Sequence, residues 1–197
     1  MTGTVRSQQR EQTRRTLLRA ARRLFAEKGY AAVGLAEIVA TAGVTKGALY
    51  HHFENKSALF AAVLEQIQAE VGERVATAAD RHTDPWAQLL AGCDAFLSGC
   101  TAPEIQQVML IDGPAVLGWH TWRAMDAAAS ARHLREVLEL LVSAGSIPRQ
   151  PIEPLAHLLS GAMNEAALWL AGTDNANALA DTTAALHRML ESLRTDI

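Results

Sequence analysis

The sequence has no long apolar run and only two cysteines among its 197 residues. No stretch approaches the roughly 20 apolar residues that cross a bilayer, and the polar start lacks the apolar segment of a signal peptide. Cys93 and Cys100 would lie about 10 Å apart along one helix, too far for a disulfide within it. We therefore expect a soluble, cytoplasmic protein with free thiols and no membrane partner.

The sequence also lacks the local motifs of common enzyme classes. It contains no His-Glu-x-x-His, no Gly-x-Ser-x-Gly and no phosphate-cradling glycine loop, and its seven histidines lack metal-ligand spacing on any one helix. Adjacent His51 and His52 would point to different faces of a helix, which suits a shared metal poorly. We predict no catalytic residue, no metal site and no cofactor. An enzyme would have to assemble its site from remote helices.

Apolar residues and an unevenly distributed charge are what the sequence does contain. Hydrophobic residues make up 49% and charged residues 20% of the chain, which is enough for a packed core and argues against disorder. Residues 1–56 carry ten basic and four acidic side chains, a net charge of +6, whereas residues 57–197 carry eight and seventeen, a net charge of −9. The basic part attracts a phosphate backbone, and the acidic part is repelled by it.

Three amphipathic segments near the start of the chain form a helix-turn-helix pattern. Residues 13–28 place apolar side chains on one face and arginines mostly on the others, and Gly29 follows as a stop. A second helix over 35–42 ends at Gly43, and a third opens at Thr45, its expected cap. Two short helices joined by a glycine-containing turn, the second with a polar outer face, are typical of DNA-binding proteins.

The third helix carries groups suited to phosphates and bases. Ala48, Leu49 and Phe53 would face inward at helical spacing, while basic, hydroxyl and aromatic groups fall on the opposite side. Gly47 lies between them, where glycine loses about 1 kcal/mol relative to alanine in a helix interior. Close approach of the helix backbone to the major groove of DNA is one gain that would offset this loss.

Many positions in the first third of the chain agree, in order and without a gap, with one family pattern. They are Gly29-Tyr30, Glu37-Ile38, the run from Ala42 to Gly47, Leu49-Tyr50, His52-Phe53, Asn55-Lys56 and Leu59-Phe60. These residues resemble the N-terminal domain of the TetR family of one-component transcriptional regulators. The resemblance implies a homodimer on a palindromic double-stranded DNA operator, usually a repressor, released when a small-molecule effector binds the C-terminal domain.

The resemblance and the helical pattern of the remaining chain imply an all-α fold. We expect a three-helix, helix-turn-helix DNA-binding domain over residues 1–56 and a helical effector-binding and dimerisation domain over 57–197. No strand or repeat is predicted. Beyond Gly72 the pattern predicts helices over roughly 85–98, 103–112, 121–143, 153–171 and 177–195, the second of them broken at Asp112-Gly113-Pro114.

One departure from the family pattern concerns the start of the second helix. The family commonly has a Thr-Ser pair there that caps the helix and touches a phosphate, whereas this chain has Val33-Gly34. Glycine is a weaker cap, but free backbone N–H groups at a helix start still bind phosphate. We therefore expect this contact to be weakened rather than lost.

Each predicted DNA contact has a simpler alternative. Lys46 and Lys56 could be solvated charges, Thr45 only a cap, and Tyr50 part of the scaffold. In the DNA-binding interpretation, the lysines contact phosphates, His51 reads bases and His52 contacts a phosphate. The predicted DNA-binding residues are Gly34, Thr45, Lys46, Gly47, Tyr50, His51, His52 and Lys56.

All four tryptophans lie outside the N-terminal segment, together with other large apolar and polar-tipped side chains. Such residues could line an apolar cavity for a hydrophobic or aromatic effector, although they are more often plain core. Asp112, His120 and Asn164 are candidate polar anchors that could equally be solvated. The predicted effector-binding residues are Trp86, Cys93, Phe96, Met109, Asp112, Trp119, His120, Trp122, Met163 and Asn164.

The last two helices are more apolar than a lone surface helix needs. Interleaved small residues allow close helix approach, so two such helices from each subunit could form a four-helix interface, although both faces could be ordinary core. The resemblance favours the dimer, because a palindrome demands a two-fold axis. The predicted interface residues are Leu155, Leu158, Leu159, Ala162, Ala166, Leu179, Leu186, Met189, Leu190 and Leu193.

Two other functions remain open at this stage. A constitutive or architectural DNA-binding protein would have no need of the long helical part beyond the N-terminal segment, which is of the size of a separate domain. An activator would carry the same DNA-binding residues as a repressor. An effector-controlled regulator is therefore the preferred interpretation of the sequence.

Overall fold

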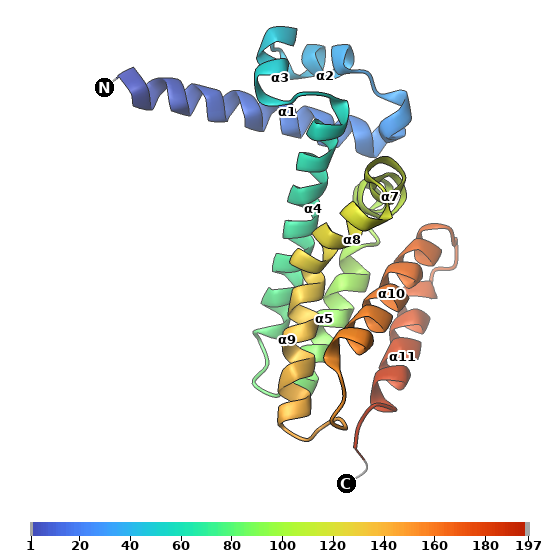
Figure 1. Cartoon of the computed structure of the whole chain (residues 1–197). Coiled ribbons are helices and arrows are strands. Elements are labelled where there is room, and N and C mark those ends of the chain that lie inside the picture. The colour runs from blue at the N-terminus through green and yellow to red at the C-terminus, as the bar shows by residue number, and fades with distance from the viewer. Residues whose placement is uncertain (1, 196–197) are drawn as a thin grey trace.

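The computed structural model describes residues 2–195, with side chains from residue 7 onward, and these residues form helices but no strand (Figure 1). The predicted all-α fold is confirmed. No helix in this part of the chain is long and apolar enough to cross a membrane. The elements are α1 (Thr2–Ala32), α2 (Leu35–Ala42), α3 (Lys46–His52), α4 (Lys56–Ala79), α5 (Pro85–Gly99), α6 (Pro103–Ile105), the π-helix η1 (Gln106–Asp112), α7 (Gly113–Leu117), α8 (Trp119–Ala128), α9 (Ser130–Ser143), α10 (Ile152–Ala171) and α11 (Ala178–Glu191).

The first three helices and the start of α4 form a small head at one end of the molecule (Figure 1). Its centre is aromatic, because the ring of Phe60 from α4 lies 5.3 Å from that of Phe25 and 5.1 Å from that of Tyr30. Helix α1 begins well before the predicted residue 13, and Gly29 interrupts it with a φ of 74°. The predicted stop at Gly29 is confirmed by this kink.

The helix-turn-helix is shaped by local caps. Gly43 ends α2 in the left-handed conformation, with a φ of 64°, which glycine adopts without steric cost. The hydroxyl of Thr45 accepts a hydrogen bond from the N–H of Ala48 at 3.2 Å and so caps α3. Asn55 caps α4 in the same way. The bounds predicted for the second helix and the Thr45 cap are therefore confirmed.

Beyond the head, α4 continues into a helical body (Figure 1). Helices α5 and α9 pack along α4, α10 packs against α9, α5 and η1, and α11 covers α5 and α10. The core is continuous from head to body, since Leu64, Ile67 and Val71 of α4 are all buried. A single helix thus connects the head with the far end of the body.

Two expectations about the body are wrong. The segment Asp112-Gly113-Pro114 does not break a helix, because η1 runs directly into α7 and the chain turns only at Gly118, with a φ of 80°. The helix expected over 121–143 is two helices, α8 and α9, separated at Ala129, whose φ and ψ are −105° and −109°. Neither glycine nor proline marks that second break, which lies against Gly72 of α4.

Candidate DNA-binding surface and effector cavity

The two faces of α3 are divided as the sequence indicates. Leu49 is fully buried and Phe53 nearly so, whereas Tyr50 is 57% exposed. Lys46 and His51 are exposed on the same outer side. This outer face therefore presents a hydroxyl-bearing aromatic ring, an ammonium group and an imidazole to solvent, a combination that donates hydrogen bonds to phosphates and base edges.

Gly47 has no packing role inside the protein. A Cβ atom added there would lie 3.9 Å from the hydroxyl oxygen of Thr45, an ordinary contact, and would meet no other atom within 4 Å. The missing side chain leaves bare backbone on the exposed surface of α3. Gly34, at the start of α2, is likewise open and makes no side-chain cap.

His52 lies half-buried beside the N-terminal part of α1. Desolvation lowers the pKa of its imidazole below 6.5, and the positive charges of Arg10, His51 and Arg14 lower it further. The guanidinium of Arg14 lies 5.7 Å from the ring centroid of Phe53. The arginines of α1 therefore border the outer end of α3. The sequence interpretation did not include these arginines in the site. Their four-residue spacing could have indicated that they share one face of the helix.

Lys56 has a structural role that the sequence interpretation missed. Its ammonium donates a hydrogen bond to the carbonyl of Tyr30 and lies 4.0 Å from the centroid of that ring. Desolvation lowers the pKa of the ammonium, and the charge of Asp112 partly opposes this. The ammonium is therefore directed at Tyr30 inside the head. Its contact with a phosphate stays a prediction.

The head is joined to the body at Tyr30. The carboxylate of Asp112, at the end of η1, accepts a hydrogen bond of 2.7 Å from the backbone N–H of Tyr30. The carboxylate of Asp112 thus links η1 to the head, and its predicted role as an effector anchor stays a prediction. A second junction is formed by Arg22, which pairs with Glu70 of α4 and, at 2.9 Å, with Glu104 of α6.

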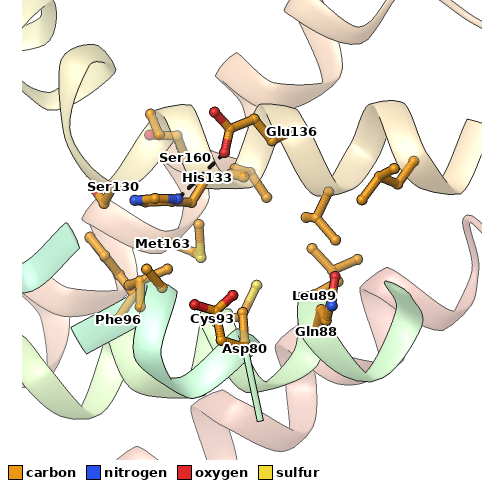
Figure 2. A pocket seen from close by; sticks show the side chains of 18 residues that line it. Asp80, Gln88, Leu89, Cys93, Phe96, Ser130, His133, Glu136, Ser160 and Met163 are labelled. Atoms are coloured by element: carbon orange, nitrogen blue, oxygen red, sulfur yellow. Dashed lines mark ion pairs between the residues drawn. The ribbon is translucent and has the colours of Figure 1, made fainter. Parts of the chain in front are cut away.

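A cavity of about 220 Å³ lies between α4, α5, α9 and α10 (Figure 2). Its walls are largely apolar, and its polar groups come from all four helices and their ends. The apolar lining residues include Val75, Leu89, Cys93, Phe96, Leu134, Val137 and Met163, and the polar ones are Asp80, Gln88, Ser130, His133, Glu136 and Ser160.

Three of the predicted effector-binding residues, Cys93, Phe96 and Met163, line this cavity. The other predicted effector-binding residues do not line it, and their role stays a prediction. Trp119 is 61% exposed on α8, and His120 beside it is also exposed. Trp86 is buried elsewhere, with the guanidinium of Arg194 at 4.9 Å from its ring centroid.

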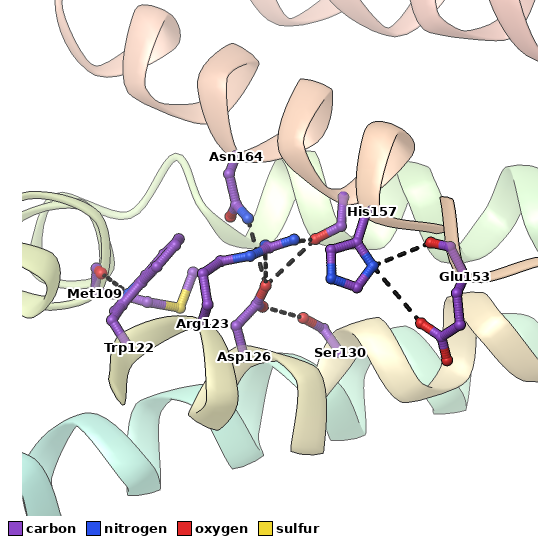
Figure 3. Close-up of polar contacts among 9 residues, drawn as sticks. Met109, Trp122, Arg123, Asp126, Ser130, Glu153, His157 and Asn164 are labelled. Atoms are coloured by element: carbon purple, nitrogen blue, oxygen red, sulfur yellow. Dashed lines mark hydrogen bonds and ion pairs between the residues drawn. The ribbon is translucent and has the colours of Figure 1, made fainter. Parts of the chain in front are cut away.

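Trp122 and Met109 serve packing near the head. The indole N–H of Trp122 donates a hydrogen bond of 2.7 Å to the carbonyl oxygen of Met109 in η1 (Figure 3). The ring also fills the space over Gly113, where an added Cβ would lie 2.8 Å from its Cδ1 atom. This buried pair fixes η1 against α8, and neither residue reaches the cavity.

Behind the cavity wall lies a buried polar cluster centred on Asp126 (Figure 3). Its carboxylate is 2% exposed and accepts hydrogen bonds from Arg123 at 2.7 Å, Ser130 at 3.1 Å and Ser160 at 3.3 Å. The side-chain amide of Asn164 approaches it at 3.5 Å, which explains the burial of that residue. The sequence interpretation missed this cluster because its members are distant along the chain.

The predicted interface residues of the last two helices divide into three groups by exposure. Leu155, Leu159, Leu186 and Leu190 are buried in the core of their own chain. Ala162, Ala166, Leu179 and Leu193 are half-buried. Leu158 and Met189 remain 72% and 55% exposed. Trp169, 53% exposed on the same helix as Leu158, was not predicted.

An exposed, polar α3 in a helix-turn-helix head, joined by one helix to a hollow body, defines a DNA-binding transcriptional regulator rather than an enzyme. Residues 17–63 match the family model for bacterial regulatory proteins of the tetR family. Residues 86–193 match the model for the tetracyclin repressor-like C-terminal domain. The chain belongs to the TetR family.

Individual relatives agree with this assignment. The Transposon Tn10 TetC protein of Escherichia coli is 28% identical over 149 residues, covering 76% of this chain and 75% of that protein. A TetR-family transcriptional regulator from Pectobacterium atrosepticum, solved by crystallography, is 37% identical with a TM-score of 0.81, and the match covers 95% of this chain and 97% of that one. RolR in complex with resorcinol shares the fold, with a TM-score of 0.72 at 23% identity, over 93% and 89% of the two chains.

Proposed function

We propose that the protein is a repressor that binds a palindromic operator as a homodimer and is released by a small-molecule effector. One observation supports this proposal most directly. The exposed helix α3 lies beside the start of α4, and the cavity in the body lies beside its end. Residues at the start of α4 pack into the head, while Val75, Ala76 and Ala79 near its end line the cavity. One rigid element therefore connects the two sites.

In this proposal, α3 enters the major groove. Tyr50 and His51 face the bases and the adjoining phosphates, Lys46 contacts a phosphate, and Gly47 allows close approach. Backbone N–H groups near Gly34 hold a further phosphate. The acidic body, repelled by the duplex, helps to orient the basic head toward it.

The proposed dimer pairs through the exposed apolar side chains of α10 and α11. Leu158 and Trp169 lie eleven positions apart on α10, which is close to three helical turns, so they share one face with each other. Met189 of α11 extends the apolar surface. To bind an operator, the dimer must hold its two copies of α3 about 34 Å apart, one helical turn of DNA.

Effector control is proposed to act through α4 and the Tyr30 junction. A ligand that fills the cavity pushes on the distal part of α4, and the Asp112 carboxylate transmits a displacement of η1 to Tyr30. Release of DNA then requires tighter ligand binding to the conformation that does not fit the operator. The complex of RolR with resorcinol, a small aromatic molecule, supports a small effector for this fold.

Quantitative binding to DNA flanking the gene tests this function. We expect the full chain to protect a palindrome with half-sites about one helical turn apart. Lys46→Ala should lower the salt dependence of binding by about one phosphate contact. Arg81→Ala, which removes an equally exposed cation from the body, should leave it unchanged.

The homodimer is tested by sedimentation of the same protein. Leu158→Asp should shift the equilibrium toward monomers and weaken operator binding together, because it places a charge in the proposed interface. A protein that remains monomeric while it binds the palindrome with full affinity would contradict this part of the proposal.

A further inference from the structure

The cavity offers hydrogen-bond acceptors far more than donors. Ser130 and Ser160 both line it, and both hydroxyls lie within 3.3 Å of the Asp126 carboxylate behind the wall. A carboxylate paired with Arg123 has no proton to give, so the serine hydroxyls donate to it. The Ser160 hydroxyl oxygen also accepts a hydrogen bond of 3.0 Å from Arg123, so it keeps one lone pair for a ligand, and the Ser130 hydroxyl keeps its lone pairs.

Gln88 follows the same pattern at the opposite side of the cavity. Its amide nitrogen donates a hydrogen bond of 2.8 Å to the carbonyl of His82, outside the cavity, which leaves the amide oxygen as an acceptor and one amide N–H as a donor. The imidazole of His133 supplies one further N–H to the lining, and its Nδ1 atom lies 3.5 Å from the Glu136 carboxylate. The carboxylate, hydroxyl and amide oxygens therefore outnumber the free donors.

The charged groups of the lining are carboxylates. Asp80, at the end of α4, and Glu136, on α9, border the cavity, and no lysine or arginine does (Figure 2). Asp80 forms no ion pair with any side chain of residues 7–195. Glu136 has only His133, at 3.5 Å, which is a counter-charge only when protonated. The charged side chains that border this largely apolar cavity are therefore negative.

We propose that the effector is a small organic ammonium compound, with an apolar body and one primary or secondary ammonium group. This inference rests on the proposed function, in which the cavity holds the effector. The ammonium N–H groups donate to the carboxylates and the serine oxygens, and charge-assisted bonds of this kind are stronger than neutral ones. The apolar body packs against Leu89, Phe96 and Met163.

Other ligand classes fit the lining less well. An anion would meet two carboxylates without a lysine or arginine to pair with. A quaternary ammonium has the correct charge but no N–H, so it cannot satisfy the acceptors. At about 220 Å³ the cavity lies below the ~300–1,000 Å³ of drug-sized pockets, so the effector is small.

The experiment measures calorimetric binding of four compounds that share one apolar body to the full chain. They are naphthylmethylamine, its trimethylammonium analogue, naphthylmethanol and naphthoate. We expect the primary amine to bind about tenfold more tightly than the alcohol and the quaternary analogue, and the carboxylate to bind most weakly. Equal or tighter binding of the carboxylate, the alcohol or the quaternary compound would overturn the inference. So would the absence of measurable binding by the amine.

Matched variants locate the effect in the cavity. Glu136→Gln should bring the Kd of the amine to within about threefold of that of the alcohol, while the Kd of the alcohol stays unchanged. Glu139→Gln removes a neighbouring carboxylate of α9 that does not line the cavity, and it should change neither value. Loss of amine binding in both variants would place the site elsewhere and refute the assignment.

Operator binding measured with the same compounds separates this inference from the proposed function. If the amine binds with the expected preference but leaves operator affinity unchanged, the ammonium class of ligand is supported and the proposed effector control is refuted. If naphthoate instead binds and causes the protein to release the operator, effector control is supported and the ammonium class of ligand is refuted.

Discussion

Replacement of Gly47 by alanine is expected to change stability and DNA binding in opposite directions. The new methyl group would lie 3.9 Å from the Thr45 hydroxyl oxygen and touch nothing else in the protein. Because alanine loses less conformational freedom than glycine in a helix, Gly47→Ala should stabilise the folded state by roughly 0.5–1 kcal/mol. Urea unfolding at a fixed protein concentration measures this gain.

The same methyl group would occupy space that we assign to DNA. Inserting a methyl group into a well-packed contact typically costs about 1–3 kcal/mol, which corresponds to a loss of roughly 5-fold to 150-fold in operator affinity. Fluorescence anisotropy with a labelled operator measures it. If the variant is more stable but binds the operator more weakly, misfolding cannot explain the weaker binding. The stability measurement therefore serves as the control for the affinity measurement.

Two results would refute the reasoning about Gly47. An unchanged operator affinity would show that the helix backbone does not approach DNA closely at this position. A fall in stability would show that the surroundings of α3 differ from those described here, because no atom of the protein opposes the added methyl group.

Three further expectations concern the head and the body. Gly113→Ala should destabilise the fold by about 1–3 kcal/mol in urea unfolding, because the new Cβ would lie 2.8 Å from the ring of Trp122; an unchanged midpoint would contradict this. Burial raises the pKa of the Cys93 and Cys100 thiols to about 12, so Ellman's reagent should react slowly with the native protein and rapidly in urea. Because desolvation lowers the pKa of His52 below 6.5, the unfolded chain binds the proton first, and stability should fall as the pH drops below 6.5. His52→Gln should lessen that fall in a pH series of unfolding curves, and an identical fall would exclude this histidine as a source.

Local features of the sequence were sufficient for the head. The stop at Gly43 and the caps at Thr45 and Asn55 depend on residues one to three positions away, so helix ends could be read directly from neighbours along the chain. The inward and outward faces of α3 follow from helical spacing alone. The DNA contacts themselves stay predictions, since they depend on a partner molecule.

The body was less predictable because its features depend on distant residues. The break at Ala129 lies in a run of alanines and reflects the passage of α4 close by, which no local pattern indicates. The tryptophans were chosen for their size and polar tips, but composition does not tell in which direction a side chain points. Trp119 faces solvent, whereas Trp122 closes the space over Gly113.

By itself, the amino-acid sequence determined the all-helical class, the helix-turn-helix with its caps, and the basic head on an acidic body, since each depends on short-range spacing or on summed charge. Tertiary structure decided where the cavity lies, which leucines of the last two helices face inward, and how Asp112 and Lys56 meet at Tyr30. These features bring together residues separated by tens of positions, and only the packing of the helices determines which of them meet.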